Sequence, residues 1–217
     1  MFDIDNVLFD VGYFEKDEKV AASSWGAIWK ELGDEKDHIR LKRNWSEGKY
    51  KTYTEWQEAA LRIFKRRGLT EERFLDVVYG LPLMKGARES VRELKRKGIL
   101  TATISGGFSE MAMRARKELG IDFPFATCSL AFKDGVMKDW AILPYDYEGK
   151  VHIFNALVKS LGIAPEECAF VCDGVNDIPL ARIVGLPIAF SARNELKKYC
   201  RAIVDSKDMR DVLKYMK

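Results

Sequence analysis

The pattern of apolar and polar positions divides the chain into two kinds of segment. Between about residues 15 and 79, apolar residues recur at helical spacing, and no stretch alternates in the way typical of a strand. The sequence predicts helices at residues 20–32, 35–45, 54–67 and from 70 onward, with Thr54 as a possible N-cap and Gly33 and Gly68 as C-terminal caps. This segment is therefore expected to form a small helical domain.

From Lys85 onward, short apolar runs alternate with amphipathic stretches. Helices are predicted at 86–97, 108–119, 151–161 and 209–216, and strands at 99–104, 168–172, 186–190 and 202–204. An Asp134-Gly135 turn predicts a hairpin between residues 125–132 and 136–137. This alternation is typical of an α/β fold with a doubly wound, Rossmann-like parallel sheet.

Phe2 is predicted to belong to the same sheet, so the helical segment is expected as an insertion after the first strand. The predicted division is a discontinuous α/β core of residues 1–12 and 85–217, with an all-helical cap domain at 13–84. Only two residues precede Asp3, whereas a buried central strand usually has five or six. A first strand this short is expected to hold Asp3 less rigidly, unless the recorded start lies downstream of the real one.

Composition narrows the class of protein. The 217 residues are 47% hydrophobic, enough for a sizeable core, and 32% charged with mixed signs, a bias also found in thermophile proteins. A net charge of +3 is too small to indicate a nucleic-acid partner. The sequence shows neither a signal peptide nor a long apolar run, so nothing in it indicates a membrane partner. The four cysteines show no Cys-x-x-Cys spacing, and nothing requires an oxidising compartment. A cytoplasmic protein is expected, with its oligomeric state undetermined.

The first candidate for chemistry is the pair Asp3 and Asp5. In an extended chain, residues two apart point to the same side, so both carboxylates can reach one small volume. Like charges that close are unfavourable without a proton or a cation between them. The pair therefore suits a divalent metal, although an acidic pair near a terminus is more often simply solvated.

Ligands of such sheets bind beyond the carboxyl ends of the strands, where further polar groups are predicted. Ser105-Gly106-Gly107 follows one strand and offers a hydroxyl and backbone N–H groups to a phosphate, although an ordinary glycine turn has the same sequence. Asp173 and Asp177 follow another strand, and their oxygens suit either Mg²⁺ or an Asx turn with a helix cap. Lys150 precedes a helix and carries little signal alone.

Together these residues resemble the haloacid dehalogenase superfamily, and most closely its phosphoserine phosphatase-like branch. The resemblance rests on Asp3-Ile4-Asp5-Asn6-Val7, which matches the DxDx[TV] motif, on Ser105 and Lys150, and on Asp173 ahead of Gly174-Val175-Asn176-Asp177. It covers nearly the whole chain, and that branch also has a helical cap inserted after the first motif.

The resemblance implies a Mg²⁺-dependent phosphatase that acts on a small phosphorylated metabolite. Asp3 is implied as the nucleophile that forms an aspartyl-phosphate, and Asp5 as the acid and then the base. The presence of Asp5 favours phosphate chemistry, because the family's dehalogenases lack an Asp at that second position of the motif. The implied metal ligands are the Asp3 side chain, the Asp5 carbonyl and Asp173, with Asp177 close by. Lys150, Ser105, Gly106 and Asn176 are implied to hold the phosphoryl group and the substrate.

Some positions depart from the family pattern. Asn6 replaces the usual Gly, where an unusual backbone conformation is expected. The cap glutamate and arginine that read serine in phosphoserine phosphatases align near Ser23 and Glu58, so phosphoserine is not the expected substrate. The cap aromatic residues form either a bundle core or a surface that selects a larger or more apolar ester; they are Trp25, Trp29, Trp45, Tyr50, Tyr53 and Trp56.

Tyr13 and Phe14 are expected in the linker to the cap, at the substrate or at a hinge. Neither His38 nor His152 is assigned to catalysis. Two alternative functions remain. One is a phosphomutase or phosphotransferase on the same scaffold, and the other is a non-catalytic binding protein that keeps the fold and acts through its cap.

Overall fold

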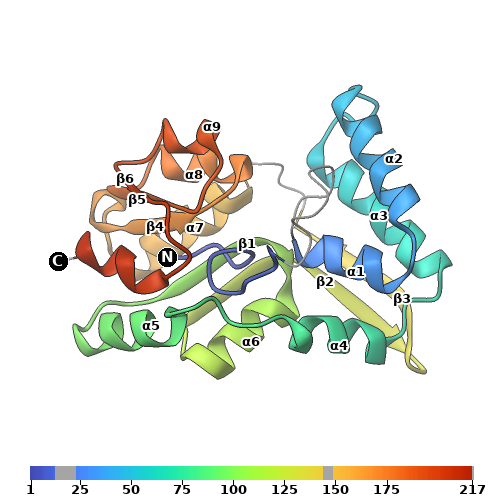
Figure 1. The fold of residues 1–217 in the computed structure, drawn as a ribbon, viewed down its shortest axis with the longest axis horizontal. Coiled ribbons are helices and arrows are strands. Elements are labelled where there is room, and N and C mark those ends of the chain that lie inside the picture. The colour runs from blue at the N-terminus through green and yellow to red at the C-terminus, as the bar shows by residue number, and fades with distance from the viewer. Residues whose placement is uncertain (13–22, 144–148, 217) are drawn as a thin grey trace.

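The computed structural model describes residues 1–12, 23–143 and 149–216, without the side chain of residue 35. A central sheet lies between layers of helices, and the helical cap packs at one end (Figure 1). The strands are β1 (Ala102–Phe108), β2 (Phe123–Lys133), β3 (Val136–Ile142), β4 (Ala169–Cys172), β5 (Leu186–Phe190) and β6 (Ala202–Val204). All neighbouring pairs are parallel except β2 with β3, which form the hairpin expected at Asp134-Gly135.

The N-terminal segment joins the two halves of the sheet. Phe2 pairs in parallel with Thr103 of β1 on one side and with Val171 of β4 on the other. The Phe2 N–H donates to Ala102 O, and the Asp3 N–H donates to Val171 O, both at 2.9 Å. Short as it is, this segment is therefore hydrogen-bonded on both edges, which fixes the backbone of Asp3 between β1 and β4.

Helices cover both faces of the sheet. The core helices are α5 (Ala87–Arg96), α6 (Ser109–Leu119), α7 (Gly149–Leu161), α8 (Ile178–Ala181) and α9 (Asn194–Lys197). Because side chains alternate along a strand, Phe170 and Cys172 of β4 pack with residues of α7 and α8. Val171, between them, packs in the other cluster with residues of α5 and α6. This two-sided burial is what the doubly wound prediction requires.

The cap helices are α1 (Ser24–Glu31), α2 (Glu35–Ser46), α3 (Tyr53–Arg66) and α4 (Glu71–Gly80). Each of α1, α3 and α4 begins after a hydroxyl residue whose oxygen accepts a backbone N–H; these are Ser23, Thr52 and Thr70. The N-cap of α3 is therefore Thr52, and the prediction of Thr54 was wrong. The domain boundaries at 13–84 stay a prediction.

Two other predicted elements differ from the structure. The strand predicted at 99–104 begins only at Ala102, and Ile99 and Leu100 are 38% and 51% exposed. The backbone N–H and hydroxyl of Thr101 both donate to Asp122, so this stretch is a tethered connection. The closing helix predicted at 209–216 is a 3₁₀-helix at Met209–Lys214. Three-residue 3₁₀-helices also occur at Pro165–Glu167 and Val175–Asp177. Among the described helices, none is long and apolar enough to cross a membrane.

Arg114 of α6 ties the cap to the core. Its buried guanidinium donates to Val78 O at 2.5 Å and to Leu81 O at 2.7 Å, at the C-terminal end of α4, and pairs with Glu118. Arg114→Met is expected to lower the free energy of unfolding by roughly 2–3 kcal/mol, because two carbonyl groups lose a charged donor. Urea denaturation checks this, with Arg116→Met on the exposed side of α6 as the control. A loss no larger than that of the control would contradict this role.

Candidate active site

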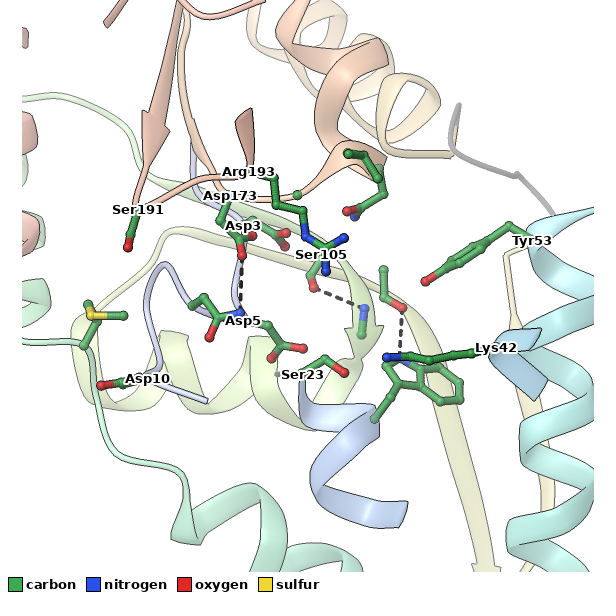
Figure 2. Close-up of a pocket in the computed structure, with 18 of the residues that line it drawn as sticks. Asp3, Asp5, Asp10, Ser23, Lys42, Tyr53, Ser105, Asp173, Ser191 and Arg193 are labelled. Carbon is green, nitrogen blue, oxygen red and sulfur yellow. Dashed lines mark hydrogen bonds between the residues drawn. The ribbon is translucent and has the colours of Figure 1, made fainter. Parts of the chain in front are cut away.

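A pocket of about 380 Å³ opens between the core and the cap, at the carboxyl ends of the parallel strands (Figure 2). Six of the residues implied by sequence line it, namely Asp3, Asp5, Ser105, Gly106, Asp173 and Asn176. The other two, Lys150 and Asp177, are buried and make ion pairs beside Asp3. The structure therefore brings together all eight predicted site residues, which come from segments far apart in the sequence.

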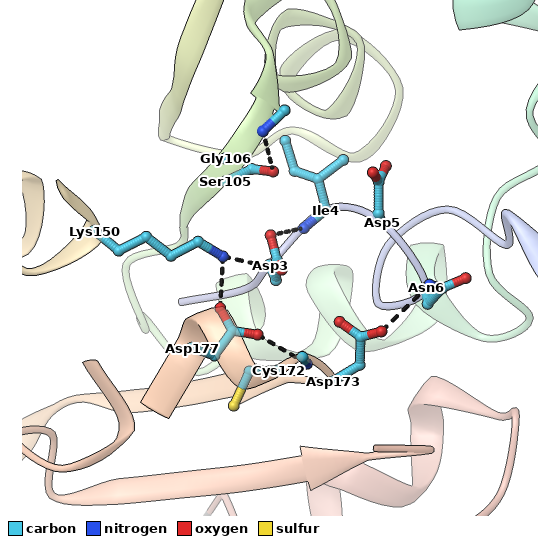
Figure 3. Close-up of polar contacts among 12 residues, drawn as sticks. Asp3, Ile4, Asp5, Asn6, Ser105, Gly106, Lys150, Cys172, Asp173 and Asp177 are labelled. Atoms are coloured by element: carbon cyan, nitrogen blue, oxygen red, sulfur yellow. Dashed lines mark hydrogen bonds and ion pairs between the residues drawn. The ribbon is translucent and has the colours of Figure 1, made fainter. Parts of the chain in front are cut away.

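Lys150 lies between two carboxylates (Figure 3). Its Nζ is 3.0 Å from Asp3 Oδ2 and 2.5 Å from Asp177 Oδ1. Burial alone would lower the pKa of Lys150, but the charges of Asp177 and Asp3 outweigh it and raise that pKa above its ordinary value. The first turn of α7 thus places a fixed positive charge against Asp3.

Asp173 follows β4 and faces the N-terminal loop. Asn6 has φ +57°, a left-handed conformation that Asn tolerates, and its Nδ2 donates to Asp173 Oδ2 at 3.3 Å. Burial and then the charges of Asp3 and Asp177 raise the pKa of Asp173 well above its ordinary value. Burial likewise raises the pKa of Asp177 to about 6, against the opposing charge of Lys150. Both shifts reflect negative charge that is crowded into a buried site.

The donor set suits a magnesium ion. One carboxylate oxygen each of Asp3, Asp173 and Asp177 lies within 4.8 Å of the others. Mg²⁺ prefers oxygen ligands, and a divalent cation would relieve the repulsion that the single ammonium of Lys150 leaves uncompensated. The residues present therefore fit the cofactor that the sequence implied.

Asp5 is held by the first residue of α1. The backbone N–H and the hydroxyl of Ser24 both donate to Asp5 Oδ2 at 2.8 Å. The second oxygen, Oδ1, is buried and has no hydrogen-bond partner among the described residues. Burial is the main cause that raises the pKa of Asp5 to about 6. A carboxyl group of this kind can retain a proton and donate it to a leaving group.

Ser105 and the two glycines after it lie within β1, which continues to Phe108, and not in a loop before α6 as predicted. The pairing of β1 with β2 shifts register between Ser105 and Phe108, so the backbone still turns polar groups toward the pocket. The Gly107 N–H donates to Ser105 Oγ at 3.1 Å. The cap holds the Gly106 carbonyl, which accepts from Gln57 Nε2 at 3.1 Å and from Trp25 Nε1 at 3.4 Å.

The cap aromatic residues occupy both of the positions weighed from sequence, the cap core and the pocket wall, while a role in substrate selection stays a prediction. Trp29 is buried, stacks on His38 and packs edge-on against Phe64. Trp25, Tyr53 and Trp56, in contrast, line the pocket. The predicted roles of Tyr13 and Phe14 lie outside the described residues.

The positions aligned with the serine-reading residues do not supply matching groups. Glu58 pairs with Arg62 at 2.6 Å on the same helix and is not among the residues that line the pocket. Ser23 does line it, but its hydroxyl caps α1 by accepting from Gly26 N.

Four basic residues of the pocket were not predicted from the sequence, namely His38, Lys42, Arg193 and Lys207. His38 and Lys42 are four apart in α2 and so share one helix face. Arg193 follows β5, another parallel strand whose carboxyl end meets the same edge. The rule that ligands bind beyond the carboxyl ends of parallel strands pointed to Asp173 and could also have pointed to Arg193. A single basic residue among 36, however, carries little signal.

Comparisons with known proteins agree with this geometry. Residues 1–185 match the haloacid dehalogenase-like hydrolase family. A phosphoserine phosphatase of Methanocaldococcus jannaschii is 31% identical over 197 residues, covering 88% of this chain and 89% of that protein. One from Wolinella succinogenes is 28% identical and covers 100% of this chain and 98% of its own.

Solved structures show the same likeness. A substrate-bound phosphoserine phosphatase complex has a TM-score of 0.82 and 28% identity, and it covers 100% of this chain and 96% of its own. A phospho-aspartyl intermediate analogue of phosphoserine phosphatase has the same TM-score and identity, with 100% and 97% covered. By the family match and by these relatives, the chain belongs to the haloacid dehalogenase-like hydrolases.

Proposed function

We propose that the protein is a Mg²⁺-dependent phosphatase that hydrolyses a small phosphomonoester through an aspartyl-phosphate on Asp3. The observation that carries this proposal is the position of Asp3. Its buried carboxylate is 3.0 Å from the Lys150 ammonium, shares a carboxylate cluster with Asp173 and Asp177, and opens into a pocket that Ser105 also lines. The similarity to a phospho-aspartyl analogue structure supports it.

In the first step, an Asp3 oxygen attacks phosphorus and the bond from phosphorus to the ester oxygen breaks. In the second, water attacks phosphorus and the bond to Asp3 breaks, which releases inorganic phosphate and restores the carboxylate. Both steps bring negative groups together, so most of the catalysis is electrostatic positioning. Lys150 supplies positive charge, and the Ser105 hydroxyl and nearby backbone N–H groups hold phosphoryl oxygens.

Asp3, Asp173 and the Asp5 carbonyl would hold Mg²⁺, with Asp177 close by. When bound, the ion neutralises charge on the carboxylates and on the phosphoryl oxygens. Asp5 protonates the departing alcohol oxygen in the first step and takes a proton from water in the second. Ser24 orients Asp5 for this work through its two hydrogen bonds.

Phosphoserine is expected to be a poor substrate, although the relatives above are phosphoserine phosphatases. Binding of the phosphoserine ammonium group requires a hydrogen-bond acceptor in the pocket, and carboxylates are the strongest acceptors. Among the described residues, the cap side of the pocket has no carboxylate; its lining consists of Ser23, Trp25, His38, Lys42, Tyr53, Trp56 and Met84, whereas Asp10 belongs to the core segment. The preferred ester is therefore expected to lack the amine.

Removal of magnesium tests the proposal. Phosphate release from a panel of phosphomonoesters is expected to stop after dialysis against EDTA and to return when Mg²⁺ is added, because the crowded carboxylates bind oxygen-preferring cations. Calcium chloride at the same concentration serves as the control for ionic strength and for ion type. Full activity in excess EDTA would contradict the metal dependence.

The panel also separates the alternative functions. Transfer of the phosphoryl group to a sugar without release of phosphate would indicate a phosphomutase or phosphotransferase. Binding without turnover of any ester would indicate a non-catalytic protein.

A further inference from the structure

We propose that Arg193 and Lys42 form a subsite for a second anionic group of the substrate, such as a carboxylate, between the core side and the cap side of the pocket. This subsite rests on the proposed phosphatase function and deepens it. Figure 2 shows the two side chains reaching into the pocket from opposite sides, Arg193 from the core and Lys42 from the cap. The preferred substrate is then a small phosphomonoester with two separate anionic groups and no amine.

Arg193 is firmly placed beside the catalytic cluster. Its backbone N–H donates to Asp173 O at 3.1 Å, and the Ser191 N–H donates to Val204 O at 2.7 Å. The turn between these anchors is further defined by Ser191, which has φ +45°. Within the described part of the chain, the Arg193 guanidinium has no carboxylate partner. An arginine held at the mouth of an active site without a protein anion is suited to an anion of the substrate.

Lys42 supplies the second cation. It comes from α2, one turn after His38, and both side chains line the pocket. Burial, followed by the charge of Arg193, lowers the pKa of Lys42 to about 8. Two cations that repel each other across a pocket gain attraction when an anion lies between them.

The rest of the cap side is also rich in donors. Trp56 lines the pocket, and its Nε1–H, which can only donate, is buried without an acceptor among the described residues. Tyr53 adds a hydroxyl on the same side. The carboxylates that line the pocket, Asp3, Asp5, Asp10 and Asp173, all come from core segments, so the core and cap sides of the pocket differ in charge. A substrate that places its phosphoryl group at Asp3 is thereby oriented by a second anion toward the cap.

Four esters of similar size test the subsite. They are 3-phosphoglycerate, which carries a carboxylate, glycerol 3-phosphate, which lacks one, phosphoserine, which adds an amine, and phosphoethanolamine, which has only the amine. We expect kcat/KM for 3-phosphoglycerate to exceed that for glycerol 3-phosphate by about tenfold or more, as expected for one charge-assisted contact. The difference should lie mainly in KM.

Arg193→Gln and Lys42→Gln are each expected to reduce this preference about tenfold, since each removes one charge-assisted contact with the second anion. Lys198→Gln, at the end of α9, and Lys36→Gln, on the same helix as Lys42, remove exposed charges outside the pocket. These controls are expected to keep the preference of the wild type.

Three outcomes overturn the subsite. Equal kcat/KM of the wild type for 3-phosphoglycerate and glycerol 3-phosphate would show that the pocket does not bind a second anionic group. An equal loss on all four esters in Arg193→Gln would place that guanidinium on the phosphoryl group. A preference for phosphoethanolamine over the other three esters would show that the pocket binds an ammonium group at the position that we assign to Arg193 and Lys42.

Binding keeps the subsite testable even if no ester is turned over, an outcome that contradicts the phosphatase proposal itself. In the Asp3→Asn background, calorimetry is expected to show tighter binding of 3-phosphoglycerate than of glycerol 3-phosphate. The added Arg193→Gln change is expected to remove the difference. Equal affinities before that change would overturn the subsite independently of catalysis.

Discussion

Asp3→Asn is expected to reduce phosphate release by more than roughly 10³-fold, since the amide cannot form the covalent intermediate. The protein should nevertheless fold. The change removes one negative charge from a buried cluster of three carboxylates, and Lys150 keeps its 2.5 Å pair with Asp177. Steady-state phosphate release with Mg²⁺ measures the loss, and thermal unfolding checks that the variant is intact.

Asp76→Asn, an exposed aspartate on α4, is the matched control and should retain full activity. If folded Asp3→Asn kept more than a tenth of the wild-type rate, another residue or a water molecule would have to be the nucleophile. In that case the position of Asp3 beside Lys150 would reflect structure alone.

Lys150→Met is expected to have the largest effect on stability, lowering the free energy of unfolding by roughly 3–5 kcal/mol. Lys150 is 4% exposed, and its removal leaves Asp3 and Asp177 buried without their cation. Activity should fall as well, because no other described side chain makes an ion pair with Asp3. Urea denaturation without added metal measures the change in stability.

Lys159→Met is the control for this prediction, because it changes an exposed lysine on the same helix, α7. Its free energy of unfolding should stay within about 0.5 kcal/mol of the wild type, as is usual for surface substitutions. A loss below about 1 kcal/mol for Lys150→Met would show that the two carboxylates take up protons, or open to water, at little free-energy cost.

The α/β core was predictable from sequence because buried strands read as apolar runs. Cys168–Cys172 is such a run, and β4 occupies all of it but the first residue. Ile99 and Leu100 also read as strand, yet both are exposed, because the hydrogen bonds from Thr101 to Asp122 set where β1 begins. The apolar character of a segment alone does not predict side-chain hydrogen bonds that set where a strand begins.

The carboxylate cluster was predictable because the carboxyl ends of parallel strands meet at one edge of the sheet. The resemblance to the haloacid dehalogenase superfamily also implied that Asp3, Asp173 and Asp177 lie together, as the structure shows. The basic groups that face each other across the pocket were not predictable in the same way. Lys42 of α2 and Arg193, which follows β5, lie 151 residues apart in the numbering, and only the tertiary fold brings them to one pocket. No local pattern carries that information.

Detection of the phosphoryl group on Asp3 is the decisive test of the aspartyl-phosphate mechanism. The enzyme is mixed with its best ester and Mg²⁺, quenched in acid during turnover and digested, and its peptides are examined by mass spectrometry. We expect one added phosphoryl group on the peptide that contains Asp3, and no such group in Asp3→Asn. Phosphate release with no modified Asp3 peptide, or with the group on another residue, would contradict this mechanism.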